Sequence, residues 1–511
     1  MPVSKLGLWS LRRKMLAALL AGAVTGLGQA PFSWIVLALI GLAAGFTLFQ
    51  ATSRTRHAAP VGWAFGVGYF ALTLCWIVEP FLIDIARHGW MAPFALIGMA
   101  AGMALFWGAA FGIAKWLRLS GGAAGGQGIA LVIFWTIAEV ARTYILTGFP
   151  WGLLGYIWLD MGLDQMAAYI GPHGLTLLTL TGVWALLAAF NHQKRLILLP
   201  LVILPFVGII WFGLAQAALG PVEDGLTERP VVRLIQPNAP QHQKWDPEMI
   251  PMFFDRSLEF TSATPQGDAP DVIIWPETSV PYLLNNAQGA LDRISQAAGG
   301  VPVVLGIQRR NAGLYHNSLV VLGPDGQITE TYDKSHLVPF GEYMPGGALA
   351  SALNLKGLAA KEGYGFGAGS GLRLIEIAGL GLAIPLICYE AIFPHEVGGL
   401  DQRADWLLQI TNDAWFGKLT GPQQHLAQAR FRAIEQGLPM VRAANTGISA
   451  VIDGRGQIVA SLGLGVAGFL DVALPPPLPE TIYARSGDWP TLLLLIISIA
   501  ILLLKSRRFS G

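Results

Sequence analysis

Charged residues are scarce in this sequence. Only 13% of its 511 residues are Asp, Glu, Lys or Arg, whereas 53% are hydrophobic. An average soluble domain is about 25% charged. The net charge is +1, and the sequence has no cluster of Lys and Arg of the kind that binds a phosphate backbone. The composition therefore excludes a nucleic-acid-binding protein and predicts an integral membrane protein.

Cysteine is also scarce. The two cysteines are Cys75, which lies in an apolar stretch predicted to be embedded in lipid, and Cys388, which lies far from any such stretch. A disulfide between them is not expected. The nine histidines and these thiols show no spacing typical of a metal site. We therefore expect no metal and no other cofactor, and a lone thiol at position 388 is a candidate nucleophile.

Apolar runs long enough to cross a bilayer, which needs about 20 residues, dominate the first part of the chain. Seven runs precede residue 218 and an eighth lies near the C-terminus: 15–30, 33–50, 61–78, 91–114, 128–146, 165–190, 196–217 and 492–504. The roughly 270 residues before the eighth run are enough for a domain with its own core. We predict a polytopic α-helical membrane domain of eight spans, with seven spans in 1–217, a large domain in 218–488, and the eighth span with a tail in 489–511.

Basic residues indicate the orientation. The clusters are Lys5, Arg12, Arg13 and Lys14; Arg54 and Arg56; Lys115 and Arg118; Lys194 and Arg195; and Lys505, Arg507 and Arg508. All fall on one side if every run spans, and the positive-inside rule makes that side the cytoplasm. Both termini are then cytoplasmic and 218–488 lies on the opposite face, the periplasm in a bacterium. A cleaved signal peptide is the alternative for the N-terminus, but a second run follows within a few residues, which favours an uncleaved anchor.

Two features of the membrane part stand out. Glu139 and Arg142 are three residues apart on one helical face, either as an intrahelical pair near the interface or with a functional role. The segment 144–158 that follows is aromatic and is interrupted by Gly and Pro. Such a segment is tolerated at membrane depth only against protein or a cavity. It is a candidate lipid-facing floor for a site.

The domain at 218–488 alternates apolar strands with turns and helical stretches, which predicts a mixed α/β fold. Predicted strands are 231–236, 271–275, 302–307, 318–322, 382–387 and 406–410, and predicted helices are 248–261, 287–298 and 423–436. Two hairpins, 317–328 and 447–458, resemble each other and suggest the halves of an internally duplicated sandwich.

Three chemically competent residues follow predicted strands: Glu277, Lys334 and Cys388. Side chains at the carboxyl ends of strands converge at one edge of an α/β layer, where sites are usually built. A carboxylate can take the thiol proton, an ammonium can hold an oxyanion, and the thiolate can attack an acyl carbon. Singly, each residue has an ordinary alternative, either a charge leaving the core or a small buried hydrophobe. Together they predict nucleophilic acyl chemistry.

The segments around these residues resemble a known family. Trp275-Pro-Glu277-Thr, Tyr332-Asp-Lys334-x-His336 and Ile387-Cys388-Tyr-Glu390 are similar to the Glu, Lys and Cys motifs of the nitrilase (carbon-nitrogen hydrolase) superfamily. Such a domain between seven spans and one span resembles the apolipoprotein N-acyltransferase family. The resemblance implies an αββα sandwich for the domain and a multi-pass enzyme of the bacterial inner membrane.

The resemblance also implies a two-step acyl transfer. Cys388 attacks the sn-1 ester of a phospholipid, typically phosphatidylethanolamine, and leaves a thioester and a lysophospholipid. The α-amine of a diacylglyceryl-cysteine at a lipoprotein N-terminus then attacks the thioester. Glu277 is expected to be the general base, and Lys334 with the main-chain N–H of Tyr389 is expected to hold the oxyanion. Membrane lipids and diacylglyceryl-lipoproteins are therefore the expected partners.

The same resemblance suggests supporting residues. Glu342 matches a second carboxylate of the family, with an exposed loop acid as the alternative. The residues expected near the pocket, with ordinary packing as the alternative, are Trp245, Tyr389, Glu390 and Trp415; Arg442 and Asn445 are expected to be structural. The loops 344–347 and 363–371 are candidate gates for lipid, or ordinary surface loops.

Two other functions share parts of this pattern. A membrane-tethered nitrilase-type amidase would use the same three residues and pass its acyl group to water. A transporter or scaffold whose soluble domain only binds a ligand would not need the thiol. Substitution of Cys388 separates the enzymes from the binding proteins, whereas the fate of the acyl group separates the transferase from the amidase.

Overall fold

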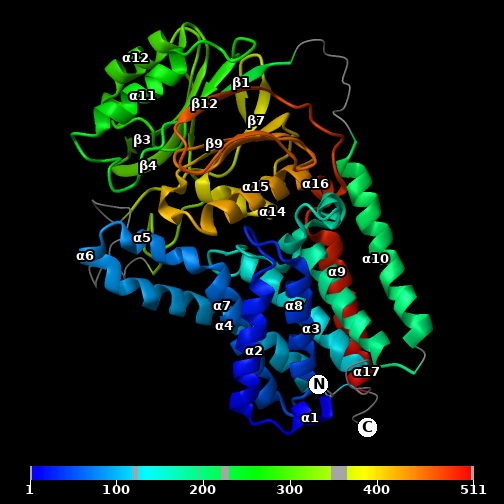
Figure 1. Cartoon of the computed structure of the whole chain (residues 1–511). Coiled ribbons are helices and arrows are strands. Elements are labelled where there is room, and N and C mark those ends of the chain that lie inside the picture. Colours follow the sequence, from blue (N-terminus) through cyan, green and yellow to red (C-terminus); the bar gives the residue numbers. More distant parts are fainter. Residues whose placement is uncertain are drawn as a thin grey trace. The chain divides into compact units, whose positions relative to one another are not determined.

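The computed structural model describes residues 3–117, 119, 125–193, 195–219, 229–346 and 365–507. The chain divides into two compact units, one made of Met1–Leu219 with Thr481–Gly511 and the other of Gly220–Glu480. In the described ranges the first unit is helical and the second holds the strands (Figure 1).

Each predicted apolar run of the first unit coincides with a helix. These helices are α2 (Leu11–Gly26), α3 (Ile35–Gln50), α4 (Thr55–Thr73), α7 (Ala92–Trp116), α8 (Gly126–Tyr144), α9 (Ala167–Phe190), α10 (Arg195–Ala217) and α17 (Trp489–Arg507). The short helices α1 (Val3–Gly7), α5 (Glu79–Leu82), α6 (Ile85–His88) and α16 (Ile482–Ser486) complete the α-helices described there.

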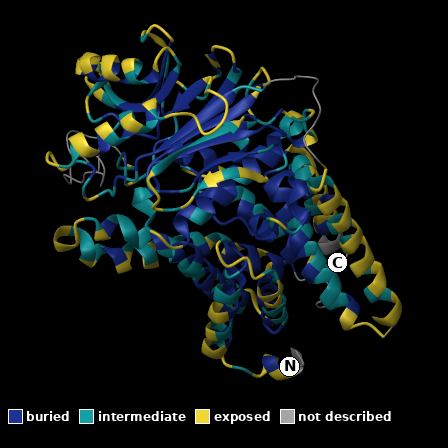
Figure 2. Cartoon of the chain, turned by 45° about the horizontal axis from the view of Figure 1, so that its top comes forward, coloured by how far each residue is buried: buried dark blue, intermediate teal, exposed yellow. Residues whose placement is uncertain are grey.

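Several of these helices suit a membrane. By length and composition, three described segments can cross one: Ile85–Trp116, Leu163–Phe190 and Arg195–Ala217. The pair Thr55–Thr73 and Cys75–Leu82, bent by 63°, adds a fourth if it is one span, and α3 and α17 are apolar but shorter. Only 6% of the apolar window of α10 is buried within the structure (Figure 2), as expected for a helix that contacts lipid. The structure therefore supports membrane helices, and the number of eight spans stays a prediction.

Glu139 and Arg142 form a buried ion pair that holds an irregular segment. The Arg142 Nη2 atom lies 2.9 Å from Glu139 Oε2, and neither side chain is exposed. Arg142 also donates to the main-chain oxygens of Phe149, Trp151 and Gly152. Every residue of the segment 151–158 is buried. This burial is tolerated because Arg142 donates hydrogen bonds to main-chain oxygens of the segment inside the protein. The prediction that it forms a lipid-facing surface is wrong for this stretch.

The second unit contains two six-stranded sheets. The first sheet has the order β12 (Gly468–Ala473), β1 (Val231–Gln236), β2 (Val272–Ile274), β3 (Val303–Asn311), β4 (Leu314–Leu322) and β5 (Ile328–Asp333). The second has the order β11 (Ile458–Leu462), β10 (Ser449–Ile452), β9 (Met440–Ala444), β8 (Trp406–Thr411), β7 (Gly381–Ile387) and β6 (Ile375–Ile377). The central strands β1, β2 and β3 are parallel, as are β7, β8 and β9.

Helices cover the outer face of each sheet. The inner faces share one core, to which Ile274 of the first sheet and Leu408 of the second contribute. Outside the first sheet lie α11 (Ile250–Ser262) and α12 (Gln288–Ala298), and α15 (Gly421–Gln436) packs outside the second (Figure 1). Strands β1 and β8 are buried along their full length, and four of the six residues in each are apolar, without the strict alternation of a strand that has one face in water. The predicted αββα sandwich is confirmed.

The two similar hairpins occupy equivalent places. The first forms β4 and β5 at one edge of the first sheet, and the second forms β10 and β11 at one edge of the second sheet. Strands β6 and β12 were not among the predicted strands. Strand β12 pairs antiparallel with β1 and thus brings the end of the domain back to its beginning.

Candidate functional site

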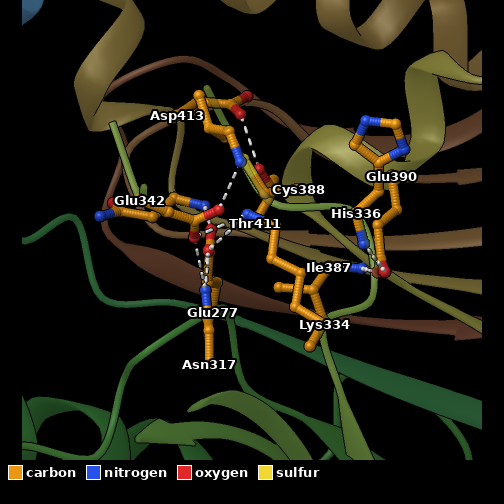
Figure 3. A network of polar contacts seen from close by, with 12 residues as sticks. Glu277, Asn317, Lys334, His336, Glu342, Ile387, Cys388, Glu390, Thr411 and Asp413 are labelled. Carbon is orange, nitrogen blue, oxygen red and sulfur yellow. Dashed lines mark hydrogen bonds and ion pairs between the residues drawn. The ribbon is translucent and has the colours of Figure 1, made fainter. Parts of the chain in front are cut away.

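Glu277, Lys334 and Cys388 meet at one end of the sandwich, as the strand-end pattern predicts. Glu277 follows β2 after two intervening residues, and Lys334 directly follows β5, so both come from the first sheet. Cys388 directly follows β7 of the second sheet. The Lys334 Nζ atom lies 3.9 Å from Glu277 Oε1. All three belong to the polar network in Figure 3.

Neighbouring amides fix the carboxylate of Glu277. Its Oε1 atom accepts a hydrogen bond from Asn317 Nδ2 of β4 at 2.7 Å, and its Oε2 atom accepts one from the main-chain N–H of Asn412 at 2.7 Å. The Glu277 side chain is only 8% exposed. A buried carboxylate with both oxygens oriented is well placed to exchange a proton with a neighbouring group.

Lys334 is held mainly by Glu342. Its Nζ atom donates to Glu342 Oε1 at 2.9 Å, and Glu342 Oε2 accepts the main-chain N–H of Val338 at 2.8 Å. Burial disfavours the charge of Lys334, but the carboxylates of Glu342 and Glu277 outweigh it and raise the pKa of the lysine. Lys334 is therefore a fixed cation beside the thiol. Glu342 is itself buried and does not lie on an exposed loop.

Cys388 has the backbone of a tight strand-to-helix turn. Its φ angle is +52°, a left-handed conformation that is rare for a residue with a side chain. The one-turn helix η7 (Cys388–Ile392) starts at this residue. Burial and the nearby charge of Glu277 raise the pKa of the thiol, and Lys334 only partly opposes this. The thiol is thus protonated at rest and has to pass its proton to a base when it reacts.

A second buried network lies behind the thiol. The carboxylate of Asp413 accepts hydrogen bonds from Arg442 and from Thr411 Oγ1, and it lies 2.9 Å from His425 Nδ1. Burial alone would raise the pKa of Asp413, but Arg442 and His425 hold it at about 2. Burial and the charge of Arg442 lower the pKa of His425. Arg442, expected to be structural, is therefore the charge partner of an ionised core aspartate.

Glu390 connects the strand ends that carry Lys334 and Cys388. Its Oε1 atom accepts hydrogen bonds from Tyr332 Oη at 2.6 Å and from the main-chain N–H of Ser335 at 2.7 Å, and its Oε2 atom accepts the N–H of Ile387 at 2.7 Å. Burial raises the pKa of Glu390 although these donors favour its charged form. Its contacts make it a support for the site.

A cavity of about 480 Å³ lies beside Glu277, which lines it, whereas Lys334 and Cys388 are not among its described lining residues. It is lined by Gln241, Lys244, Trp245, Glu277, Thr278, Leu283, Gln308, Tyr315, Asn317, Glu342, Gly365, Phe366, Asn412 and Trp415. Eight of these fourteen residues are polar or charged and four are aromatic, so the cavity offers both hydrogen-bonding groups and apolar surface to a small molecule. Trp245 and Trp415 line it, as predicted from the resemblance. Tyr389 and Glu390 are not among the described lining residues, and Tyr389 packs against Phe393 with ring centroids 5.0 Å apart.

The loops proposed as gates are only partly described. Gly347 of the first loop and residues 363 and 364 of the second lie outside the described residues. Of the second loop, Gly365 and Phe366 line the cavity. Within the described ranges, no group of His, Cys, Asp and Glu residues is arranged to hold a metal ion.

Sequence reasoning missed several residues of the site. Asn412 and Asp413 directly follow β8, which ends at Thr411, one residue beyond the predicted strand 406–410, so the rule that selected Glu277, Lys334 and Cys388 could have found them. Asn317 opens one of the predicted hairpins, where its polar side chain had no evident role.

The chain matches known proteins along most of its length. Residues 232–480 match the family described as "Carbon-nitrogen hydrolase", and residues 21–185 match the "Apolipoprotein N-acyltransferase N-terminal domain". A carbon-nitrogen hydrolase superfamily protein from Xanthomonas campestris is similar in structure, with 19% identity and a TM-score of 0.36, over 52% of this chain and 97% of that chain.

Curated relatives cover both units. An apolipoprotein N-acyltransferase from Rhodopseudomonas palustris is 36% identical over 98% of this chain and 96% of its own length. One from Brucella melitensis is 37% identical over 97% of both chains. With this identity over nearly its full length, the chain belongs to the apolipoprotein N-acyltransferase family.

Proposed function

We propose that this protein is a membrane-bound N-acyltransferase that moves a fatty acyl chain from a phospholipid to the α-amine of a lipoprotein's N-terminal diacylglyceryl-cysteine. The observation that carries the proposal is the placement of the buried Cys388 thiol, on a left-handed turn, beside the Glu277 and Lys334 pair. The match of the membrane part to the N-terminal domain of acyltransferases supports a lipid-derived donor.

In the first step Glu277 takes the thiol proton while Cys388 attacks the sn-1 ester carbonyl of the donor, with phosphatidylethanolamine as the preferred phospholipid. The carbonyl electron pair moves onto its oxygen, which Lys334 and the main-chain N–H of Tyr389 stabilise. Collapse of this intermediate breaks the ester bond. The departing glycerol oxygen takes the proton from Glu277, and lysophospholipid leaves with a thioester remaining on Cys388.

In the second step the lipoprotein's α-amine attacks the thioester carbonyl. Glu277 accepts a proton from the amine, and the sulfur of Cys388 leaves as the thiolate and is then reprotonated by Glu277. An amide is formed and the free enzyme is restored. Glu342, Trp245 and Trp415 support this chemistry by holding Lys334 and by lining the cavity.

We further propose that the chain crosses the bacterial inner membrane eight times. The domain in 218–488 then lies in the periplasm and both termini lie in the cytoplasm. The clusters of basic residues between the apolar runs support this orientation. A donor that resides in a bilayer explains why the sandwich is joined to apolar helices.

The test is detection of the acyl-enzyme. Purified protein is mixed with phosphatidylethanolamine and analysed by intact-protein mass spectrometry, and we expect one acyl adduct on the wild type and on Cys75→Ser but none on Cys388→Ala. A diacylglyceryl-cysteine peptide with a free α-amine should discharge the adduct, whereas its N-acetylated form should not. An adduct that water discharges equally fast without peptide would indicate the amidase-like hydrolase. A wild type without any adduct would contradict both enzymatic functions.

A further inference from the structure

Lys244 is a buried cation in the wall of the cavity, and the proposed chemistry leaves it without a role. It lies between β1 and α11, is only 8% exposed, and lines the cavity together with Trp245 and Glu277. Its ammonium donates to the main-chain oxygen of Glu277 at 3.2 Å and lies 5.7 Å from the ring of Trp245.

This ammonium has no carboxylate of its own. In the described part of the chain, no Asp or Glu oxygen lies within 4.0 Å of its Nζ atom, and Glu277 and Glu342 are both already close to Lys334. Burial lowers the pKa of Lys244 to about 8, and the charge of Glu277 offsets this only in part. A desolvated cation with one hydrogen bond and free N–H groups is best satisfied by an anion that enters the cavity.

The position of this cation suits one group of the acyl donor. The ammonium of Lys244 contacts the main-chain oxygen of Glu277. The carboxylate of Glu277, at the other end of the same residue, lies 3.9 Å from Lys334 Nζ. In a glycerophospholipid the sn-1 ester oxygen and the phosphorus are joined through the glycerol carbons. A glutamate has a similar number of covalent bonds between its main-chain oxygen and its carboxylate. The two pairs of groups can therefore be about equally far apart. A donor whose ester lies near the Glu277 carboxylate can therefore place its phosphate near Lys244.

We propose that Lys244 binds the phosphodiester of the acyl donor and so makes the enzyme select glycerophospholipids over neutral glycerides. This inference rests on the proposed acyltransferase function. The neutral lining residues Gln241 and Gln308 are further hydrogen-bond donors in the same cavity. Lys244 acts in donor binding and takes no part in bond making at Cys388.

The test compares donors with and without phosphate. Initial rates of acyl-adduct formation on Cys388 are measured in detergent micelles, with phosphatidylethanolamine or with diacylglycerol of the same acyl chains. We expect the wild type to load at least about tenfold faster from the phospholipid at low donor concentration. Lys244→Met should abolish this preference by slowing phospholipid loading about 10- to 100-fold, with diacylglycerol loading and discharge to the peptide unchanged.

Three controls keep the test decisive. Lys418→Met makes the same change at an exposed position and should retain the preference, as should Lys244→Arg, which keeps the charge. If Lys244→Met does not fold, competition in the wild type replaces it, and glycerophosphoethanolamine should slow loading more than inorganic phosphate does. Equal inhibition by the two would assign the cation to free phosphate and overturn the headgroup proposal.

A Lys244→Met protein that keeps the wild-type preference would also overturn the proposal. Failure of the wild type to load from any donor would instead contradict the acyltransferase function itself.

Discussion

The side-chain amide of Gln409 donates a hydrogen bond to the main-chain oxygen of Cys388 at 3.2 Å. Arg442 donates to the other end of this amide, the Oε1 atom, at 2.6 Å, which fixes the amide with its nitrogen toward Cys388. The oxygen of Cys388 and the N–H of Tyr389 belong to one planar peptide group. Gln409 therefore orients the proposed oxyanion donor without touching the substrate, and it also stabilises the left-handed backbone of Cys388.

Replacement of Gln409 by Met keeps the length of the side chain but removes the N–H donor. We expect acyl-adduct formation to slow about 10- to 100-fold because the peptide group after Cys388 loses one of its two described side-chain contacts; the other is His425 Nε2, 3.1 Å from the Cys388 oxygen. The phospholipid concentration that gives half the maximal rate should stay unchanged, since Gln409 is not part of the described cavity lining. Gln436→Met, the same change at the end of α15, is the matched control. A normal loading rate with only a lower melting temperature would show a purely structural role.

Glu342 keeps Lys334 away from the proposed base. The Lys334 Nζ atom lies 2.9 Å from Glu342 Oε1 but 3.9 Å from Glu277 Oε1. With Glu342→Gln we expect the ammonium to pair with Glu277 instead, which makes this carboxylate a weaker base and slows both half-reactions about 10- to 100-fold. Single-turnover loading and discharge measure the two steps separately. Glu396→Gln, a partly exposed acid, should leave both rates unchanged, and unaffected rates in Glu342→Gln would refute this role.

The pKa of about 8 for Lys244 predicts how donor binding depends on pH. The ammonium is charged below this pKa and loses its charge above it, so the half-saturating phospholipid concentration should rise as the pH passes about 8. Lys334, Glu277 and Glu342 face the same region. The raised pKa values of Lys334 and of the Cys388 thiol keep both protonated in this range. Lys244→Arg should show no such rise, because arginine stays charged, and a similar rise in both proteins would contradict the assignment.

Glu390 should matter for stability. Its carboxylate accepts five hydrogen bonds, from the side chains of Tyr332 and Ser335 and from the main-chain N–H groups of Ser335, His336 and Ile387. Glu390→Gln turns an NH₂ group toward some of these donors and should lower the free energy of unfolding by about 2–4 kcal/mol. Thermal unfolding in detergent measures this effect. Tyr332→Phe should have a smaller effect and the exposed Glu376→Gln almost none. Equal melting temperatures for Glu390→Gln and Glu376→Gln would contradict the prediction.

The strand-end pattern predicted where Glu277, Lys334 and Cys388 lie, because the chain itself marks where an apolar strand stops. It did not predict Asn317 or Gln409, whose side chains project from within strands β4 and β8. In short strands buried on both faces, the sequence shows no alternation that tells which face a polar residue occupies. Their roles became visible only when the register of the two sheets was known.

In the membrane unit the sequence predicted the helices but misjudged the surroundings of 151–158. A segment rich in apolar and aromatic residues has the same composition whether it contacts lipid or is covered by protein. The distinction came from Glu139 and Arg142, whose buried pair needs polar main-chain groups nearby. That requirement is a property of packing, and no sequence spacing encodes it.

The origin of the site residues in different sheets has a consequence for folding. The thiol comes from the second sheet, whereas the carboxylate and the ammonium come from the first. When only one sheet has formed, either the thiol or its base is in its native position, and the two groups are not within reach of each other. Acyl chemistry therefore begins only after the two sheets have packed, and the appearance of thioester-forming activity during refolding would time that packing event.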